Sequence, residues 1–350
     1  MSQTIAIFVD AYRSINSQKL FWLGLGISGL VVAAFACVGI NPQGVKLLFW
    51  QIDSPWFNTG TTPPAMFYKQ MFVSVGIGLW LAWLAAILAL VSTAGIFPRL
   101  SESGTIDLFV SKPISRLRLF VTEYLAGLLF VTLQVTIFSV ASLLVIGLRG
   151  GVWEPGLLAA VPLVVCFFSY LFAVCVLLGL LTRSTVAGLL LTLLFWFIVS
   201  MLGQAEESVL MFQAMERHEA GFTVRTYRPA GRVEDGDDGS GDIATEHGPA
   251  AAREPSASGG LETARRVLGT VNTVLPKTRQ TIALLQRWLI RLADLPPASD
   301  NPQQQAMQAA QRDFQETLYG RSPFWILGTS LGFELVVLAC AAWVFCRRDY

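Results

Sequence analysis

Apolar residues are gathered into long blocks along this chain rather than spread at helical or strand spacing. A bilayer core about 30 Å thick requires roughly 20 apolar residues per helix, whose backbone groups must be hydrogen-bonded within the helix itself. Six windows meet this requirement: Leu20–Ile40, Met71–Ile96, Leu119–Leu148, Leu157–Leu181, Ser184–Leu202 and Pro323–Cys346. The pattern predicts an all-α polytopic membrane protein with six transmembrane helices.

The segments between these blocks differ in character. Before the first block, apolar side chains recur at roughly helical spacing among charged ones, which predicts an amphipathic helix lying in the membrane interface. The predicted layout is residues 1–19, an interfacial helix; 20–203, spans one to five, with a cytoplasmic insert at 99–118; 204–321, a long polar segment; and 322–350, span six with a short tail.

The polar segment between spans five and six changes composition along its length. Residues 233–260 are crowded with Asp, Glu, Gly, Ser and Pro, which cannot bury enough apolar surface to order themselves, so we expect 204–260 to be largely flexible. Apolar residues then step by three and four on both sides of Pro276, and again before residue 320. This spacing predicts a helical hairpin over 261–320, packed on itself, on the membrane face or on a second copy.

Positive charge predicts the orientation, because cytoplasmic loops of membrane proteins are rich in Lys and Arg. With a cytoplasmic amino terminus, the short outer loops hold only Lys46, Lys69 and Arg149, and most other span-flanking cations lie inside. Both termini and the 99–118 insert are therefore expected in the cytoplasm, with 204–321 outside. We expect an integral protein of the bacterial inner (cytoplasmic) membrane.

Composition excludes several classes of function. The chain is 53% hydrophobic and 14% charged with a net charge of +1, so it lacks the basic face that a nucleic-acid partner requires. His218 and His247 have neither metal-ligand spacing nor a nucleophile motif nearby. The cysteines fall within or beside predicted spans, where they serve as small apolar residues: Cys37, Cys166, Cys175, Cys340 and Cys346. We expect no catalytic, metal or cofactor site in this chain.

The outer loop after the first span is rich in aromatic residues. Phe49, Trp50, Trp56 and Phe57 lie close together there, near several prolines. Aromatic side chains are enriched where membrane meets water, so anchoring in the interface is the economical explanation. A substrate gate is the alternative.

A polar, turn-rich insert separates spans two and three. From Ser103 to Arg116 it reads Ser-Gly-Thr-Ile-Asp-Leu-Phe-Val-Ser-Lys-Pro-Ile-Ser-Arg. Gly104 permits a tight turn, Pro113 restricts the residue before it, and Ser115 can cap a helix that begins at Arg116. These features predict a rigid polar knob at the base of the two spans.

This stretch resembles the Gly-Thr, Leu and Ser-x-Pro-Ile-Ser-Arg stretch of type-2 ATP-binding-cassette (ABC) exporter permeases, and the overall layout is similar to theirs. Glu123, where a basic residue is common, and the long 204–321 segment depart from that pattern. The resemblance implies that the insert contacts an ATPase through a set of residues: Glu102, Gly104, Thr105, Asp107, Lys112, Pro113, Ser115 and Arg116.

The same resemblance implies partners. It implies two copies of a cytosolic ABC ATPase subunit, which bind ATP and Mg, and a second permease chain that is identical or paralogous. The chain itself contains no Gly-x-x-x-x-Gly-Lys-Ser/Thr phosphate loop, so we expect it to be a non-catalytic subunit. An extracytoplasmic partner for 204–321 stays open.

Glu334 is the conspicuous acid within the predicted spans, about midway along the last one. A charged carboxylate there costs roughly 2.5 kcal/mol or more, so the side chain is expected to face the bundle interior or a wet cavity. It is a candidate intramembrane functional residue. The structural alternative is a protonated Glu bonded to a neighbouring Ser, Thr or Gln, such as Gln134.

Two functions are consistent with these patterns. The first is the permease subunit of an ABC exporter, which couples ATP hydrolysis by a separate subunit to substrate movement across or out of the membrane. The alternative is a non-transporting scaffold or mechanotransmission subunit that recruits an extracytoplasmic partner through 204–321.

Overall fold

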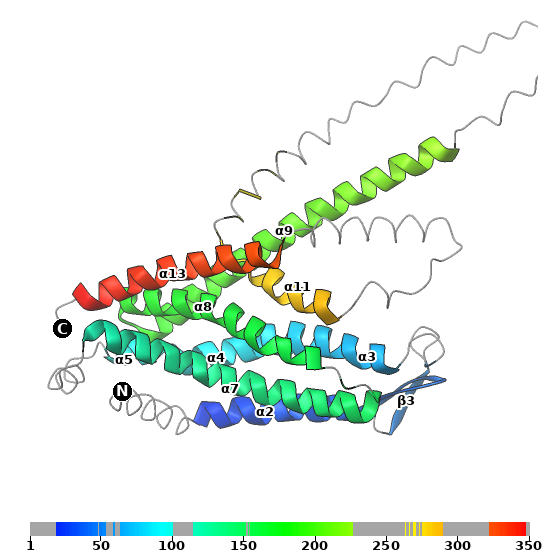
Figure 1. The fold of residues 1–350 in the computed structure, drawn as a ribbon, viewed down its shortest axis with the longest axis horizontal. Coiled ribbons are helices and arrows are strands. Elements are labelled where there is room, and N and C mark those ends of the chain that lie inside the picture. The colour runs from blue at the N-terminus through cyan, green and yellow to red at the C-terminus, as the bar shows by residue number, and fades with distance from the viewer. Residues whose placement is uncertain are drawn as a thin grey trace, which may run out of the picture. The chain divides into compact units, whose positions relative to one another are not determined.

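Figure 1 shows a computed structural model of the chain. It describes residues 19–47, 49–53, 59, 64–100, 115–151, 153, 155–226, 263, 266, 269, 270, 273, 275–289 and 322–347. The interfacial helix predicted for 1–19 lies outside these residues except for Lys19, which begins helix α2. The described part of the chain is almost entirely helical, with one small β-sheet.

Five described helical stretches are long and apolar enough to cross a membrane: Phe67–Pro98, Arg116–Gly150, Pro155–Thr182, Thr185–Phe212 and Pro323–Arg347. Helix α2 (Lys19–Cys37) contains a shorter apolar stretch, Phe21–Cys37. The protein is therefore an all-α integral membrane protein, as the apolar blocks predict.

The second apolar window is not a uniform α-helix. It comprises α3 (Pro64–Met71), the π-helix η1 (Phe72–Ala85), α4 (Ala86–Thr93) and α5 (Ile96–Leu100). π-Helical turns are rare and are frequently found at functional sites. This stretch leads directly toward the insert at 99–118.

The remaining helices include two long ones. α7 (Arg116–Gly150) is followed by the short 3₁₀-helix η2 (Pro155–Ala159) and by α8 (Ala160–Thr182). α9 (Thr185–Thr226) continues as a helix past the end of its apolar stretch at Phe212. α13 (Pro323–Arg347) is the last helix of the chain.

A tight turn joins α8 to α9. Arg183 has a left-handed backbone with φ of 54°, and the Ser184 hydroxyl accepts a hydrogen bond of 3.3 Å from the backbone N–H of Ala187. Beyond the turn, Gly188 lies so close to Gly179 that a Cβ atom on it would meet the Gly179 Cα at 2.7 Å. The two helices therefore approach each other closely just beyond the turn.

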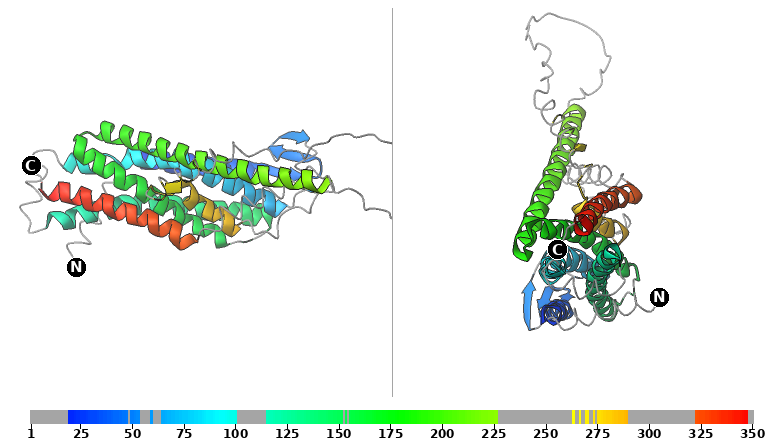
Figure 2. Two further views of the ribbon diagram at one scale, coloured as in Figure 1. Left: turned by 90° about the horizontal axis from the view of Figure 1, so that it is seen from above. Right: turned by 90° about the vertical axis from the view of Figure 1, so that its left-hand side faces the viewer.

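Helix α8 lies at the centre of the bundle. It packs against α7 on one side and α13 on another, and α7 in turn packs against α2 (Figures 1 and 2). Its phenylalanines Phe167, Phe168 and Phe172 are almost completely buried. Ser169 and Tyr170, two polar residues of α8, are therefore held away from lipid by its neighbours.

Three short strands follow α2, which the sequence pattern did not predict. β1 (Val38–Asn41), β2 (Gly44–Leu47) and β3 (Trp50–Asp53) form an antiparallel sheet in the order β1-β2-β3. The predicted first span reaches Ile40, whereas the helix ends at Cys37 because the chain enters β1 at the next residue.

The chain divides into two compact units. The described residues between 19 and 201, 275–289 and 322–347 belong to the first, and 202–226 with the described residues between 263 and 273 belong to the second. Within the first unit, α11 (Thr278–Leu289) packs on α8, η1 and α13. Most of the residues predicted to be a flexible loop or a helical hairpin lie outside the described part, so those predictions stay predictions.

Candidate functional site

Three aromatic rings pack together at the two ends of the insert. Phe97, just before the insert, and Phe120, just after it, lie with ring centroids 5.0 Å apart. Phe345 of α13 contacts both rings, at 6.4 Å and 5.8 Å. All three rings are almost completely buried. The two ends of the insert are therefore fastened to each other and to the last helix.

Ser115 and Arg116, at the end of the insert, make hydrogen bonds that also hold this end in place. Ser115 is the N-cap of α7, and its hydroxyl accepts a hydrogen bond of 3.3 Å from the backbone N–H of Arg118. Arg116 donates a 3.4 Å hydrogen bond to the backbone carbonyl of Cys346 in α13. The predicted cap at Ser115 is confirmed. The other predicted contact residues lie outside the described residues: Glu102, Gly104, Thr105, Asp107, Lys112 and Pro113.

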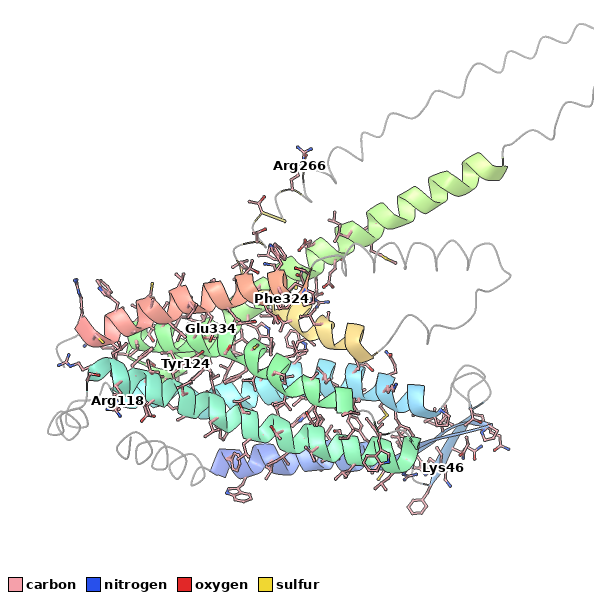
Figure 3. All side chains as sticks on the ribbon, in the orientation of Figure 1. Lys46, Arg118, Tyr124, Arg266, Phe324 and Glu334 are labelled. Carbon is pink, nitrogen blue, oxygen red and sulfur yellow. The ribbon has the colours of Figure 1, made fainter. Side chains whose placement is uncertain are left out.

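Glu334 lies deeper in the bundle, at the meeting point of α7, α8 and α13. The Tyr124 hydroxyl donates to its Oε1 at 2.8 Å and the Ser169 hydroxyl donates to its Oε2 at 2.8 Å. Figure 3 shows Tyr124 and Glu334 pointing toward each other from α7 and α13. Glu334 as a whole is only 7% exposed, so its side chain faces the bundle interior.

The structure agrees in part with the alternative of a Glu334 bonded to a neighbouring Ser, Thr or Gln: Ser169 is such a partner, and Gln134 is not. Gln134 lies elsewhere on α7, where its amide nitrogen is 2.7 Å from the position of a Cβ on Gly24 of α2. Tyr124 and Ser169 take its place. Both are polar residues within apolar helices, a signal that the sequence contains, but neither stands at a recognisable spacing from Glu334.

The hydrogen bonds around Glu334 can accommodate either protonation state. The Tyr124 hydroxyl is also 3.1 Å from the carbonyl oxygen of Ser169, and the Ser169 hydroxyl is 2.8 Å from that of Cys166. Each hydroxyl has one hydrogen and can donate fully to one acceptor. When the carboxyl group carries a proton it can donate to a hydroxyl oxygen, and that hydroxyl then donates to its backbone carbonyl. Only hydrogens need to move.

A second group of polar side chains lies about one helical turn before Glu334 on α13. Ser330, one helical turn away and completely buried, accepts a 3.0 Å hydrogen bond from the backbone N–H of Lys277. The Lys277 ammonium donates to the Thr329 hydroxyl at 2.8 Å and lies 4.1 Å from the centre of the Trp325 ring. Lys277, only 4% exposed, therefore binds the segment before α11 to α13.

Tyr170 follows Ser169 on α8 and is completely buried, and its hydroxyl has no hydrogen-bond partner among the described residues. We define the polar core as Tyr124, Ser169, Tyr170, Lys277, Thr281, Ser330 and Glu334. Hydrogen bonds among its other members join four helical segments of the first unit inside an otherwise apolar bundle, where a polar group that lacks a partner is costly.

Comparisons with protein-family models, with curated proteins and with solved structures gave no match to this chain.

Proposed function

We propose that the chain is the permease subunit of an ATP-driven exporter of the type-2 ABC kind. The proposal rests on one juxtaposition: the stretch from Ser103 to Arg116 that resembles the coupling motif of such permeases, and the fastening of the insert's two ends. Phe97, Phe120 and Phe345 hold those ends together. A force applied to an insert fastened in this way moves several helices together instead of bending a loose loop.

The proposed path of the force runs through α7. Ser115 and Arg116 begin this helix, and Tyr124 lies on it eight residues beyond Arg116. A tilt of α7 changes the distance between the Tyr124 hydroxyl and Glu334 on α13. Glu334 is therefore proposed as a positioning residue that couples the insert to the last helix.

The rest of the proposed assembly follows from the resemblance. Six spans include α2, both termini and the insert face the cytoplasm, and the protein resides in the inner membrane of a bacterium. Two ATPase subunits supply ATP hydrolysis with Mg, since this chain has no phosphate loop. A second permease chain completes the complex.

The test is co-purification of ATPase activity with the tagged chain from membranes of its host. Vanadate-sensitive ATP hydrolysis is expected in the purified complex reconstituted in nanodiscs. Replacing residues 104–113 by a Gly-Ser stretch of equal length is expected to remove it, while Ser115 and Arg116 keep the helix cap. The matched control replaces residues 236–245 in the same way and is expected to retain the activity.

Two results would contradict the proposal. One is hydrolysis that survives the replacement of residues 104–113. The other is a wild-type chain that purifies, folded, with no such activity. In either case the insert does not couple this protein to an ATPase.

A mechanotransmission role is the second candidate, and α9 favours it. This helix continues beyond its apolar stretch, from Phe212 to Thr226, and a continuous helix transmits displacement along its axis. Hydrolysis in sealed liposomes that rises with an added amphiphilic cargo, together with movement of that cargo, supports export. Hydrolysis with no cargo movement supports mechanotransmission.

A further inference from the structure

The β-sheet that follows α2 has one wholly apolar face. Residues that pair directly across antiparallel strands project to the same side, as do alternate residues along a strand. Val38 pairs with Leu47, which pairs with Trp50. Two residues further along each strand, Ile40 pairs with Val45, which pairs with Ile52. One face therefore carries six apolar residues: Val38, Ile40, Val45, Leu47, Trp50 and Ile52.

The opposite face is polar. It consists of Gly39, Asn41, Gly44, Lys46, Gln51 and Asp53. The Gln51 amide donates to the Asp53 carboxylate at 3.1 Å and to the Gln43 side chain at 2.6 Å. These side chains bond to one another in an exposed position, which is the behaviour of a face in water.

The apolar face is largely uncovered by the chain itself. Trp50 is 76% exposed, Ile52 59% and Leu47 45%, and Phe49 at the tip of the second hairpin is 90% exposed. A contiguous apolar surface of this kind marks an interaction site or a membrane contact. The question is which partner covers it.

Hydrogen bonds hold the sheet at one end of the helix bundle, and this position indicates what covers its apolar face. β1 begins at the residue after α2 ends, and its Val38 carbonyl accepts a 2.9 Å hydrogen bond from the Tyr68 hydroxyl. Arg149 donates to the carbonyl of Ala36. Tyr68 and Arg149 lie near the ends of two other apolar helices, Phe67–Pro98 and Arg116–Gly150. The sheet is therefore tied to the level at which three apolar helices end, and Figure 3 shows Lys46 at that end of the bundle.

We propose that the sheet lies on the bilayer, with its apolar face against the boundary between lipid headgroups and acyl chains. Tryptophan and aromatic rings are enriched at this depth. Among the described strands, β3 pairs only with β2, so its other edge presents backbone groups that require hydrogen-bonding partners and exclude the acyl core. The sheet thus extends the membrane contact of α2 sideways at the surface. This inference does not depend on the proposed exporter function.

The two-residue periodicity provides the test. The photoreactive residue p-benzoylphenylalanine is introduced singly at positions 50, 51, 52 and 53 of the full-length chain, in nanodiscs of phosphatidylethanolamine and phosphatidylglycerol that hold one copy each. After irradiation, intact-mass spectrometry is expected to show at least threefold more lipid adduct at positions 50 and 52 than at 51 and 53. Position 51 and position 53 are the matched controls on the polar face.

Other outcomes overturn the proposal. Equal adduct yields at the four positions would show that the two faces do not differ in lipid contact, and an absence of lipid adducts at 50 and 52 would place the apolar face in water. Cross-linked dimers formed at 50 and 52 in native membranes, in place of lipid adducts, would assign the face to a second copy. Cross-links there to a different protein would assign it to a partner protein.

A second measurement does not depend on tolerance of the photoreactive residue. The fluorescence lost in Trp50→Phe is attributed to Trp50. In the parent chain, that component is expected to be quenched several-fold more by lipids brominated near the headgroup than by aqueous acrylamide. The reverse order would contradict contact with lipid.

Discussion

Helices α8 and α9 are similar in hydropathy but occupy opposite environments. The mean hydropathy of their apolar windows is 2.7 and 2.3, yet 72% of the window is buried in α8 and only 28% in α9. Both satisfy the length and composition of a span. Hydrophobicity therefore predicts that a helix enters the membrane and not what it packs against. The difference lies in the neighbours: α8 packs against α7, α11 and α13, which together cover it.

The strongest test of this contrast truncates one phenylalanine on each helix. Phe172 on α8 is completely buried and stacks on the Tyr124 ring at 5.0 Å, whereas Phe197 on α9 is 56% exposed. Phe172→Ala is expected to lower the free energy of unfolding by about 3 kcal/mol, the low end of the range for a buried aromatic residue, because the reference state is lipid instead of water. Phe197→Ala is expected to cost less than about 0.5 kcal/mol.

Reversible unfolding in mixed detergent and sodium dodecyl sulfate micelles measures both variants. Equal losses for Phe172→Ala and Phe197→Ala would show that α9 is as tightly packed as α8. They would then remove the distinction between the two helices.

The next test addresses the close contact between α8 and α9. A Cβ at position 188 would meet the backbone of Gly179, which cannot move aside like a side chain. Gly188→Ala is therefore expected to destabilise the protein by about 2 kcal/mol, within the range for overpacking. Gly26→Ala on α2 is the matched control, since nothing lies within 4 Å of its added methyl group.

The same unfolding assay measures the two glycine variants. Gly26→Ala is expected to be neutral or slightly stabilising because alanine favours a helix. A neutral Gly188→Ala would mean that α9 is free to separate from α8.

The smallest expected effect comes from a test of how the polar core is held together around Glu334. Tyr124→Phe and Ser169→Ala each remove one donor to Glu334. In a double-mutant cycle, the coupling free energy between them is expected to be about 0.6 kcal/mol, the average for such interactions within membranes. With Glu334→Leu as the background, the coupling is expected to vanish.

A coupling that persists in the Glu334→Leu background would show that Tyr124 and Ser169 interact directly. The carboxyl group would then not be the link between α7 and α8. The cycle therefore separates a role for Glu334 from simple packing.

The sequence predicts the membrane helices well because apolar length is a local property. The windows beginning at Leu119 and Pro323 fall within α7 and α13. Glu334 is also found from the sequence, since an acid in an apolar block is unusual and must be buried or paired. These predictions need no information about which helices are neighbours.

The β-sheet was missed although its signal is present. Val38, Val45 and Trp50 each begin a short apolar alternation, and the turn residues Pro42 and Gly44 lie between the first two. Four-residue strands give too few repeats to distinguish a strand from the end of a helix. The long apolar run of α2 extended the predicted helix over β1.

The partners within the polar core could not be predicted because they are set by tertiary contacts. Tyr124 and Glu334 are 210 residues apart, and Lys277 lies in a segment that the sequence assigns outside the membrane. A cation there is ordinarily expected in water. Its burial against Trp325 and Thr329 follows from the packing of α11 on α13, which no local pattern encodes.

The tight turn at Arg183 and Ser184 has a consequence for biosynthesis. With only two residues between α8 and α9, the emerging polypeptide offers the insertion machinery both helices as one antiparallel unit. Inserted as such a unit, Ser169 and Tyr170 enter the membrane together with α9, whose apolar residues add to the favourable free energy of insertion. In this order of events α9, the less buried of the two helices, assists the insertion of α8, the more buried one.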